Sequence, residues 1–119
     1  MFTLMTRGRR LLRLHFITHE NAQDGLLTAQ PDGTYKSGAW GKMRKILPQV
    51  IGAAIHLHEN QQAESWCRGR ITAWEHAENH PGRITFTFMP DKTIAPATTR
   101  RWGMEQTRVW DDCDSMENT

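Results

Sequence analysis

The stretch from Ile55 to Phe88, IHLHENQQAESWCRGRITAWEHAENHPGRITFTF, decides the fold prediction for this chain. With Ala54 in front of it, the stretch contains three short runs rich in apolar and β-branched residues: Ala54–His58, Trp66–Trp74 and Arg83–Phe88. Runs of this kind, bounded by turn residues, are typical of β-strands that bury one face. His80-Pro81-Gly82 forms a turn between the last two runs, so we expect three successive strands here.

Further strands are predicted on both sides of this stretch. The run LLRLHFITH, at 11–19, alternates strongly enough for a first strand, and Glu105–Trp110 alternates well enough for a final one. A dense turn region, QPDGTYKSG, follows a short apolar patch at Leu26 and Leu27. Short apolar runs separated by such turns favour a β-rich fold over a helical bundle.

One segment outside the strands is a helix candidate. Gly41–Leu47 places Met43, Ile46 and Leu47 on one face, and Pro48 limits the helix to a turn or two. A second short turn is expected at 48–51. The predicted class is therefore α+β but mostly β: a small, mostly antiparallel β-barrel with one or two short helices.

Length and composition fit a single folded domain. The chain has 119 residues, of which 38% are hydrophobic and 24% charged, and no run approaches the ~18 apolar residues of a membrane helix. The N-terminus has no long apolar core or small-residue cleavage site, so we expect no signal peptide. Cys67 and Cys113 lie far apart, which predicts free thiols in a reducing cytoplasm, with no membrane partner.

The net charge of +2 is unevenly distributed. We divide the chain into a basic arm at 1–10, a β-barrel domain at 11–110 and an acidic tail at 111–119. Residues 1–16 contain four arginines and no acid, whereas the tail contains four acids and no base. Two interpretations stay open: both ends are solvated and disordered, or the arm contacts phosphate and the tail competes with it.

A pair of histidines raises the question of a metal site. His56 and His58 lie two residues apart, so on a strand both rings point to one face, and Glu64 could add a carboxylate. This pattern resembles part of the cupin motif, although the spacing differs at every interval. It keeps open a metal-dependent barrel enzyme. His15 and His19, four apart on a strand, would be separated by ~13 Å and are not a pair.

The combination of tryptophan and basic residues is more suggestive. Four of the five tryptophans have lysine or arginine close in sequence. Nucleic-acid binders use basic side chains for phosphates and aromatic faces for unpaired bases. We expect Trp74 and Trp110 to be core residues, and we keep Trp40, Trp66 and Trp102 as candidates for ligand contact. The sequence contains no hydrolase motif and no nucleotide-binding loop, which favours a binding module over an enzyme.

The order of segments resembles the PUA-like superfamily, which includes PUA, ASCH, EVE and YTH domains. The residues that carry the resemblance are Trp40, Gly52 ahead of IHLH, Gly69 within CRGRITAW, and the GRITFTF strand, over roughly 11–110. The resemblance implies a compact β-barrel that binds RNA or a modified nucleobase in a cleft beside it. It places Trp40 and the basic residues after it near that cleft.

We therefore predict a non-catalytic module, without cofactor, that recognises RNA or a modified or unpaired nucleobase. The expected contact residues are Trp40, Lys42, Arg44, Lys45, Arg68, Arg70, Arg100, Arg101 and Trp102. Phosphates would lie on the lysines and arginines, and a base would stack on Trp40 or Trp102. An alternative is a small protein-binding inhibitor or adaptor of phage or mobile-element type. The small size of the chain and its charged ends fit that function as well.

Overall fold

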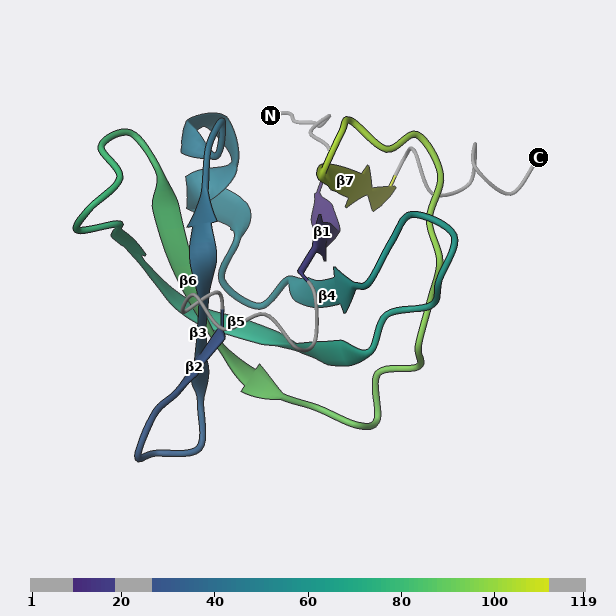
Figure 1. Ribbon diagram of the computed structural model, residues 1–119, viewed down its shortest axis with the longest axis horizontal. Helices are drawn as coiled ribbons and strands as arrows, with labels where there is room; N and C mark the ends of the chain where they lie inside the picture. The colour runs from purple at the N-terminus through teal and green to yellow at the C-terminus, as the bar shows by residue number, and fades with distance from the viewer. Residues whose placement is uncertain (1–9, 19–26, 112–119) are drawn as a thin grey trace, which may run out of the picture.

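The structure, a computed structural model, describes residues 10–18 and 27–111 and is a small, mostly-β domain (Figure 1). Its strands form one seven-stranded sheet in the order β2-β3-β6-β5-β4-β1-β7. The strands are β1 (Leu11–Ile17), β2 (Leu27–Ala29), β3 (Tyr35–Trp40), β4 (Ala54–His58), β5 (Cys67–His76), β6 (Ile84–Pro90) and β7 (Gln106–Trp110). The prediction of a mostly-β domain is confirmed. The predicted arm and tail lie almost entirely outside the described residues.

The predicted mostly antiparallel pairing is observed, but the predicted closure into a barrel is wrong. Five of the six strand pairs in the described residues are antiparallel, and the exception is β1, which pairs with β4 in parallel and places His15 beside His56. The sheet is open, because the outer strands β2 and β7 of the described sheet do not pair with each other. The alternation of apolar residues identifies strands but says little about which strands become neighbours. Here the first strand inserts between the fourth and the last.

The helical segment is shorter and tighter than predicted. It is a 3-10 helix, η2 (Arg44–Gln49), and Pro48 lies inside it. The bonds from the Ile46 N–H to the Met43 carbonyl, and from the Val50 N–H to the Leu47 carbonyl, span three residues rather than four. No helix in the described part of the chain is long and apolar enough to cross a membrane.

The hydrophobic core lies on one face of the sheet, beneath η2. Buried side chains from the strands and from the helical segment fill it, namely Leu11, Leu14, Phe16, Met43, Ile46, Val50, Ala53, Ile55, Leu57, Ile71, Ile84, Phe86 and Phe88. Trp110 packs against this cluster. Trp74, which was expected in the core, is 37% exposed. The pairing of β5 with β6 shifts between Ile71 and Ala73, and Trp74 follows that shift.

The opposite face of β1 and β4 carries the histidines. Because neighbouring residues on a strand point to opposite faces, Leu14 and Phe16 enter the core while His15 faces away from it. The long connection between β6 and β7, residues 91–105, covers that second face, and we call it the covering segment (Figure 1). It is held by the Arg68 Nε–H, which donates to the Ile94 carbonyl over 2.8 Å.

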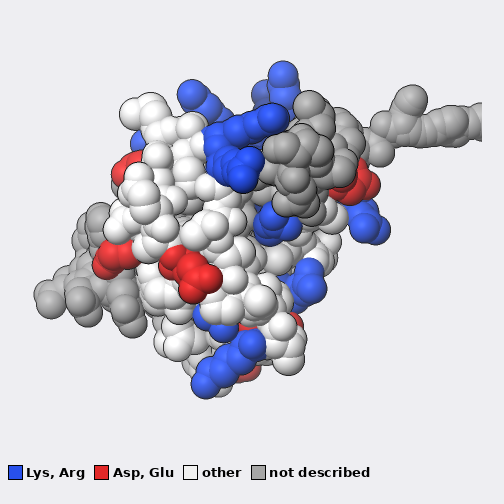
Figure 2. Space-filling model, turned by 90° about the vertical axis from the view of Figure 1, so that its right-hand side faces the viewer, with Lys and Arg blue, Asp and Glu red and all other residues white. Residues whose placement is uncertain are grey.

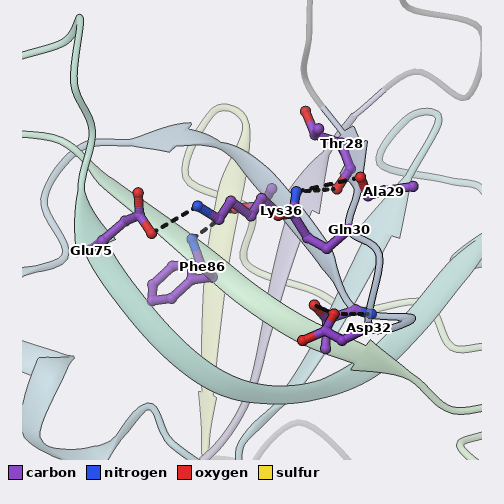
Figure 3. Close-up of polar contacts among 9 residues, drawn as sticks. Thr28, Ala29, Gln30, Asp32, Lys36, Glu75 and Phe86 are labelled. Atoms are coloured by element: carbon purple, nitrogen blue, oxygen red, sulfur yellow. Dashed lines mark hydrogen bonds and ion pairs between the residues drawn. The ribbon is translucent and has the colours of Figure 1, made fainter.

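The outer face of β2, β3, β6 and β5 is held by short-range polar contacts (Figure 3). Lys36 Nζ lies 3.1 Å from Glu75 Oε1, across β6 from one strand to another. In the turn before β3, Asp32 Oδ1 accepts hydrogen bonds from the backbone N–H and the hydroxyl of Thr34. These bonds also lower the pKa of the Asp32 carboxyl. The charges on this face are therefore used within the protein.

Candidate functional site

A cleft of about 760 Å³ opens where the curled sheet fails to close. It lies between the end of β3 and strand β7, and we call it the seam cleft. Its walls are formed by residues 39–42, Arg83, Arg101, residues 103–108 and Trp110. These residues come from opposite ends of the sheet and from the covering segment, so the cleft exists only in the folded chain.

Side chains of β7, rather than backbone hydrogen bonds between paired strands, connect the two sides of the seam cleft. Gln106 Nε2 donates to the Gly41 carbonyl over 3.3 Å. Arg108 Nη2 donates to the Lys42 carbonyl, and between them Thr107 Oγ1 donates to the Arg101 carbonyl over 3.2 Å. Three consecutive residues of one strand thus hold three backbone carbonyls around the cleft.

The seam cleft is predominantly basic. Its lining contains Lys42, Arg83, Arg101 and Arg108 but one carboxylate, that of Glu105. Partial burial lowers the pKa of the Arg108 guanidinium, but an arginine side chain stays charged at neutral pH. Lys and Arg side chains are also scattered over the neighbouring face of the molecule, with fewer Asp and Glu (Figure 2). Opposite charge attracts an anionic ligand most strongly in a recess, where solvent screens it less.

Backbone strain also concentrates at this cleft. Within 10–18 and 27–111, the non-glycine residues with positive φ are Lys42 at 63°, Arg101 at 59° and Met104 at 60°. All three line the cleft. Such conformations cost about 1–3 kcal/mol each and persist where the surrounding structure fixes them. Strain of this kind is common at ligand-binding sites.

Trp40 joins the cleft to the core. Its ring stacks on Phe16, with centroids 4.1 Å apart and an interplanar angle of 19°. The residue is half-buried and lines the cleft at the end of β3. Its shielded indole N–H has no acceptor among the described residues, so Trp40 offers the cleft apolar ring surface rather than a hydrogen bond.

The structure brings together only some of the residues predicted to bind nucleic acid. Trp40, Lys42 and Arg101 line the seam cleft. Arg44 and Lys45 are exposed on η2, two and three residues after Lys42, and Arg100 is exposed beside Arg101.

Three others have positions away from the cleft lining. The Arg68 side chain is bonded to the covering segment, and Arg70 Nη1 donates to the Gly52 carbonyl over 3.3 Å. Trp102 packs against the histidines. Trp66, the remaining candidate tryptophan, donates from Nε1 to the Thr18 carbonyl over 2.7 Å.

Arg83 and Arg108 line the cleft although they were not predicted as contact residues. Trp110, expected in the core, packs against the core cluster and also lines the cleft. Arg83 precedes β6, and Arg108 alternates with buried Thr107 and Val109 along β7. That alternation does indicate that Arg108 faces away from the histidine side. The sequence has no signal that brings it near Lys42.

Two of the three buried histidines, His15 and His58, belong to one hydrogen-bond chain. His58 Nδ1 lies 2.9 Å from the Ala63 carbonyl, which can only accept, so this nitrogen carries a proton. His58 Nε2 is then the acceptor for His15 Nδ1–H over 2.7 Å. His15 Nε2 in turn accepts from Arg13 Nε–H over 3.1 Å. Every donor faces an acceptor when both rings are neutral.

The surroundings keep these histidines neutral. Burial lowers the pKa of His15 to about 2, aided by the neighbouring histidines and Arg13. Burial, with nearby His58 and arginines, lowers the pKa of His56 to about 3, and burial also lowers the pKa of His58. His56 Nδ1 is 2.9 Å from Ser65 Oγ. This is a structural cluster with satisfied polar atoms rather than a set of acids and bases open to a ligand.

The metal-ligand set proposed from the sequence does not form. Glu64 is exposed, whereas His56 and His58 are buried. His15 stacks on His56, with centroids 4.6 Å apart and an interplanar angle of 17°, so their lone pairs do not converge on one point. Among the described residues, no group of three His, Cys, Asp or Glu side chains could hold a metal ion.

Comparison with known proteins adds no assignment: no protein-family model, curated protein or solved structure matches this chain.

Proposed function

We propose that this chain is a nucleic-acid-binding module, related to the PUA-like group, that holds an unpaired or modified nucleobase of RNA or DNA in the seam cleft. The supporting observation is the meeting of four basic side chains with the apolar surface of Trp40 in one recess. Phosphates lie on Lys42, Arg83 and Arg101, and the base packs against Trp40. Nucleic-acid ligands need both elements, charge for the backbone and ring surface for the base.

The proposal changes the contact surface expected from the sequence. Arg83 and Arg108 join Lys42 and Arg101. Arg68 instead binds the covering segment, Arg70 binds the Gly52 carbonyl, and Trp102 packs on the histidines. Arg44 and Lys45, exposed beside Lys42, extend the basic surface outward along η2. A strand whose nucleotide enters the cleft continues along these residues.

The test is fluorescence anisotropy with labelled single-stranded RNA and DNA oligonucleotides across a range of salt concentrations. For three phosphate contacts, log K should fall against log salt with a slope of about −2, since each contact adds about −0.7. Arg83→Gln should weaken binding several-fold and make the slope shallower by about 0.7. Lys92→Gln removes one exposed charge outside the cleft lining and should leave the affinity within about twofold.

Absence of binding to any oligonucleotide at low salt would overturn the proposal. Equal losses in Arg83→Gln and Lys92→Gln would show attraction to overall charge without use of the cleft. Capture of one stoichiometric protein partner, with no nucleic acid carried along, would favour the protein-binding alternative.

A further inference from the structure

Consecutive residues of the covering segment contact two different parts of the protein, the seam cleft and the buried histidines. Arg101 lines the seam cleft, Trp102 packs on the buried histidines, and Gly103 lines the cleft again. The backbone therefore crosses the wall between the histidine cluster and the cleft at Trp102. A movement of that ring must displace the residues on both sides of it.

Trp102 rests on a rigid support. Its ring meets His58 edge-on, with centroids 5.1 Å apart at 89°, and meets His15 at 6.2 Å and 73°. Both histidines are fully buried and are fixed by the chain of hydrogen bonds from Arg13 to Ala63. The rotational freedom of the tryptophan is accordingly small.

Arg101 is held in a conformation that it would not adopt alone. Its φ is 59°, in the left-handed region, and its carbonyl accepts the Thr107 hydroxyl over 3.2 Å. Its own side chain is exposed in the cleft, so it does not hold the backbone in place. The anchors of Arg101 are thus Trp102 on one side and Thr107 on the other.

We infer that Trp102, seated on His15 and His58, is a positioning residue that sets Arg101 in the seam cleft for contact with a phosphate. This inference rests on the proposed function. It assigns Trp102 a role opposite to that expected from the sequence, because a ring packed on two histidines is not offered to a base. The histidine cluster then supports the binding site from below without touching the ligand.

A double-mutant cycle tests the inference, with a labelled single-stranded RNA oligonucleotide as the probe. Arg101→Gln removes the phosphate contact, and Trp102→Ala removes its support. We expect each change to weaken binding several-fold, and the double variant to bind no more weakly than Arg101→Gln alone. Additive losses would overturn the inference, as would full affinity in Trp102→Ala.

Two milder variants guard against loss of folding. Thr107→Val keeps the shape of the side chain and removes only the hydrogen bond to the Arg101 carbonyl, so it should also weaken binding. Trp102→Phe keeps a ring on the histidines and removes an indole N–H that has no acceptor among the described residues, so it should bind like the wild type. Unchanged affinity in Thr107→Val would contradict the inference, just as full affinity in Trp102→Ala would.

Backbone ¹⁵N relaxation of the unbound protein gives a readout that needs no ligand. The order parameter at Arg101 should fall from the rigid value of about 0.85 in both Trp102→Ala and Thr107→Val, but not in Trp102→Phe. If the wild type binds no RNA yet this fall occurs, the proposed function fails and the positioning role stands. If RNA binds and the order parameter does not change, the positioning role fails alone.

Discussion

Gly69 shows how the absence of one side chain lets strands lie close together. It lies on β5, buried, opposite Ile55 of β4 and Pro90 of β6. A Cβ at this position would lie 2.4 Å from the Met89 carbonyl oxygen and 2.6 Å from Phe88 Cδ2. Both distances are shorter than real Cβ contacts allow, and one of the opposing atoms is backbone.

Gly69→Ala should therefore destabilise the protein by about 1–3 kcal/mol, because the β5–β6 pair must separate to admit the methyl group. Urea unfolding followed by tryptophan fluorescence measures the change. The matched control is Gly41→Ala, where the new Cβ meets nothing within 4 Å and φ is not positive. Similar midpoints for Gly69→Ala and the wild type would contradict the close packing described.

For single residues, the sequence predicted the face of the strand to which a side chain points better than the residues that lie beside it on other strands. The alternation of β4 correctly predicts that His56 and His58 share a face. It does not predict that His15 lies beside them, since the parallel pairing of β1 with β4 joins residues far apart in the chain. The hydrogen bond between His15 and His58 follows from that pairing.

The covering segment is the element that joins the two faces of the molecule. Ser65 anchors its middle: its backbone N–H donates to the Ala97 carbonyl, and its Oγ accepts the Ala97 N–H over 3.2 Å. The same hydroxyl contacts His56. A buried hydroxyl with two partners cannot be removed without leaving one of them unsatisfied.

Ser65→Ala should cost about 1–3 kcal/mol and loosen the covering segment. Hydrogen–deuterium exchange should rise across 91–105 more than in β5 and β6. Thr72→Ala serves as the control, because Thr72 is exposed and its bond to the Thr87 carbonyl is long, at 3.4 Å. If exchange in the segment were equal in the two variants, Ser65 would not be its anchor.

Among the elements, strand positions were predictable and pairings were not. The observed β4 has the predicted bounds, and β5, β6 and β7 begin one residue later than predicted. The helical segment begins three residues late, because Lys42 has a φ of 63° and so cannot belong to a right-handed helix. Edge and centre positions depend on contacts across the whole chain, which local alternation does not encode.

For the molecule as a whole, the neutral histidines couple stability to pH. Their pKa values in the unfolded chain are near 6.5, and folding lowers all three. Below about pH 6.5 the unfolded chain binds protons that the folded protein does not, so stability is complete above that pH and falls as pH decreases. A proton on His58 Nε2 would also face the N–H of His15.

We expect the free energy of unfolding to fall by up to about 1.4 kcal/mol per pH unit for each cluster histidine, from about pH 6.5 downward. Urea titrations between about pH 7.5 and about pH 4.5 measure this slope. His76→Gln, at an exposed position on β5, should keep the wild-type slope. A stability that stays constant down to about pH 4.5 would mean that the histidines are not held neutral.

The arrangement of the whole sheet determines which basic residues of the seam cleft could be predicted from the sequence. Lys42 and Arg101 each have a tryptophan close in sequence, and that local pattern identified them as candidates. Arg108 also lies near a tryptophan, Trp110, but was not a candidate because Trp110 was assigned to the core. Arg83 has no tryptophan near it in sequence, and it reaches the cleft from the start of β6. Charge patterns in sequence thus found half of the basic lining.

The open sheet has a consequence for the encounter of two copies of the protein. An unclosed sheet exposes strand edges, on which a second chain can add its own strand and begin aggregation. Here β2 has only three residues, and β7 turns Gln106 and Arg108 toward the carbonyls of Gly41 and Lys42. The side-chain bonds that frame the seam cleft therefore also hold residues 41 and 42 beside β7, at the edge where a second chain would otherwise add a strand.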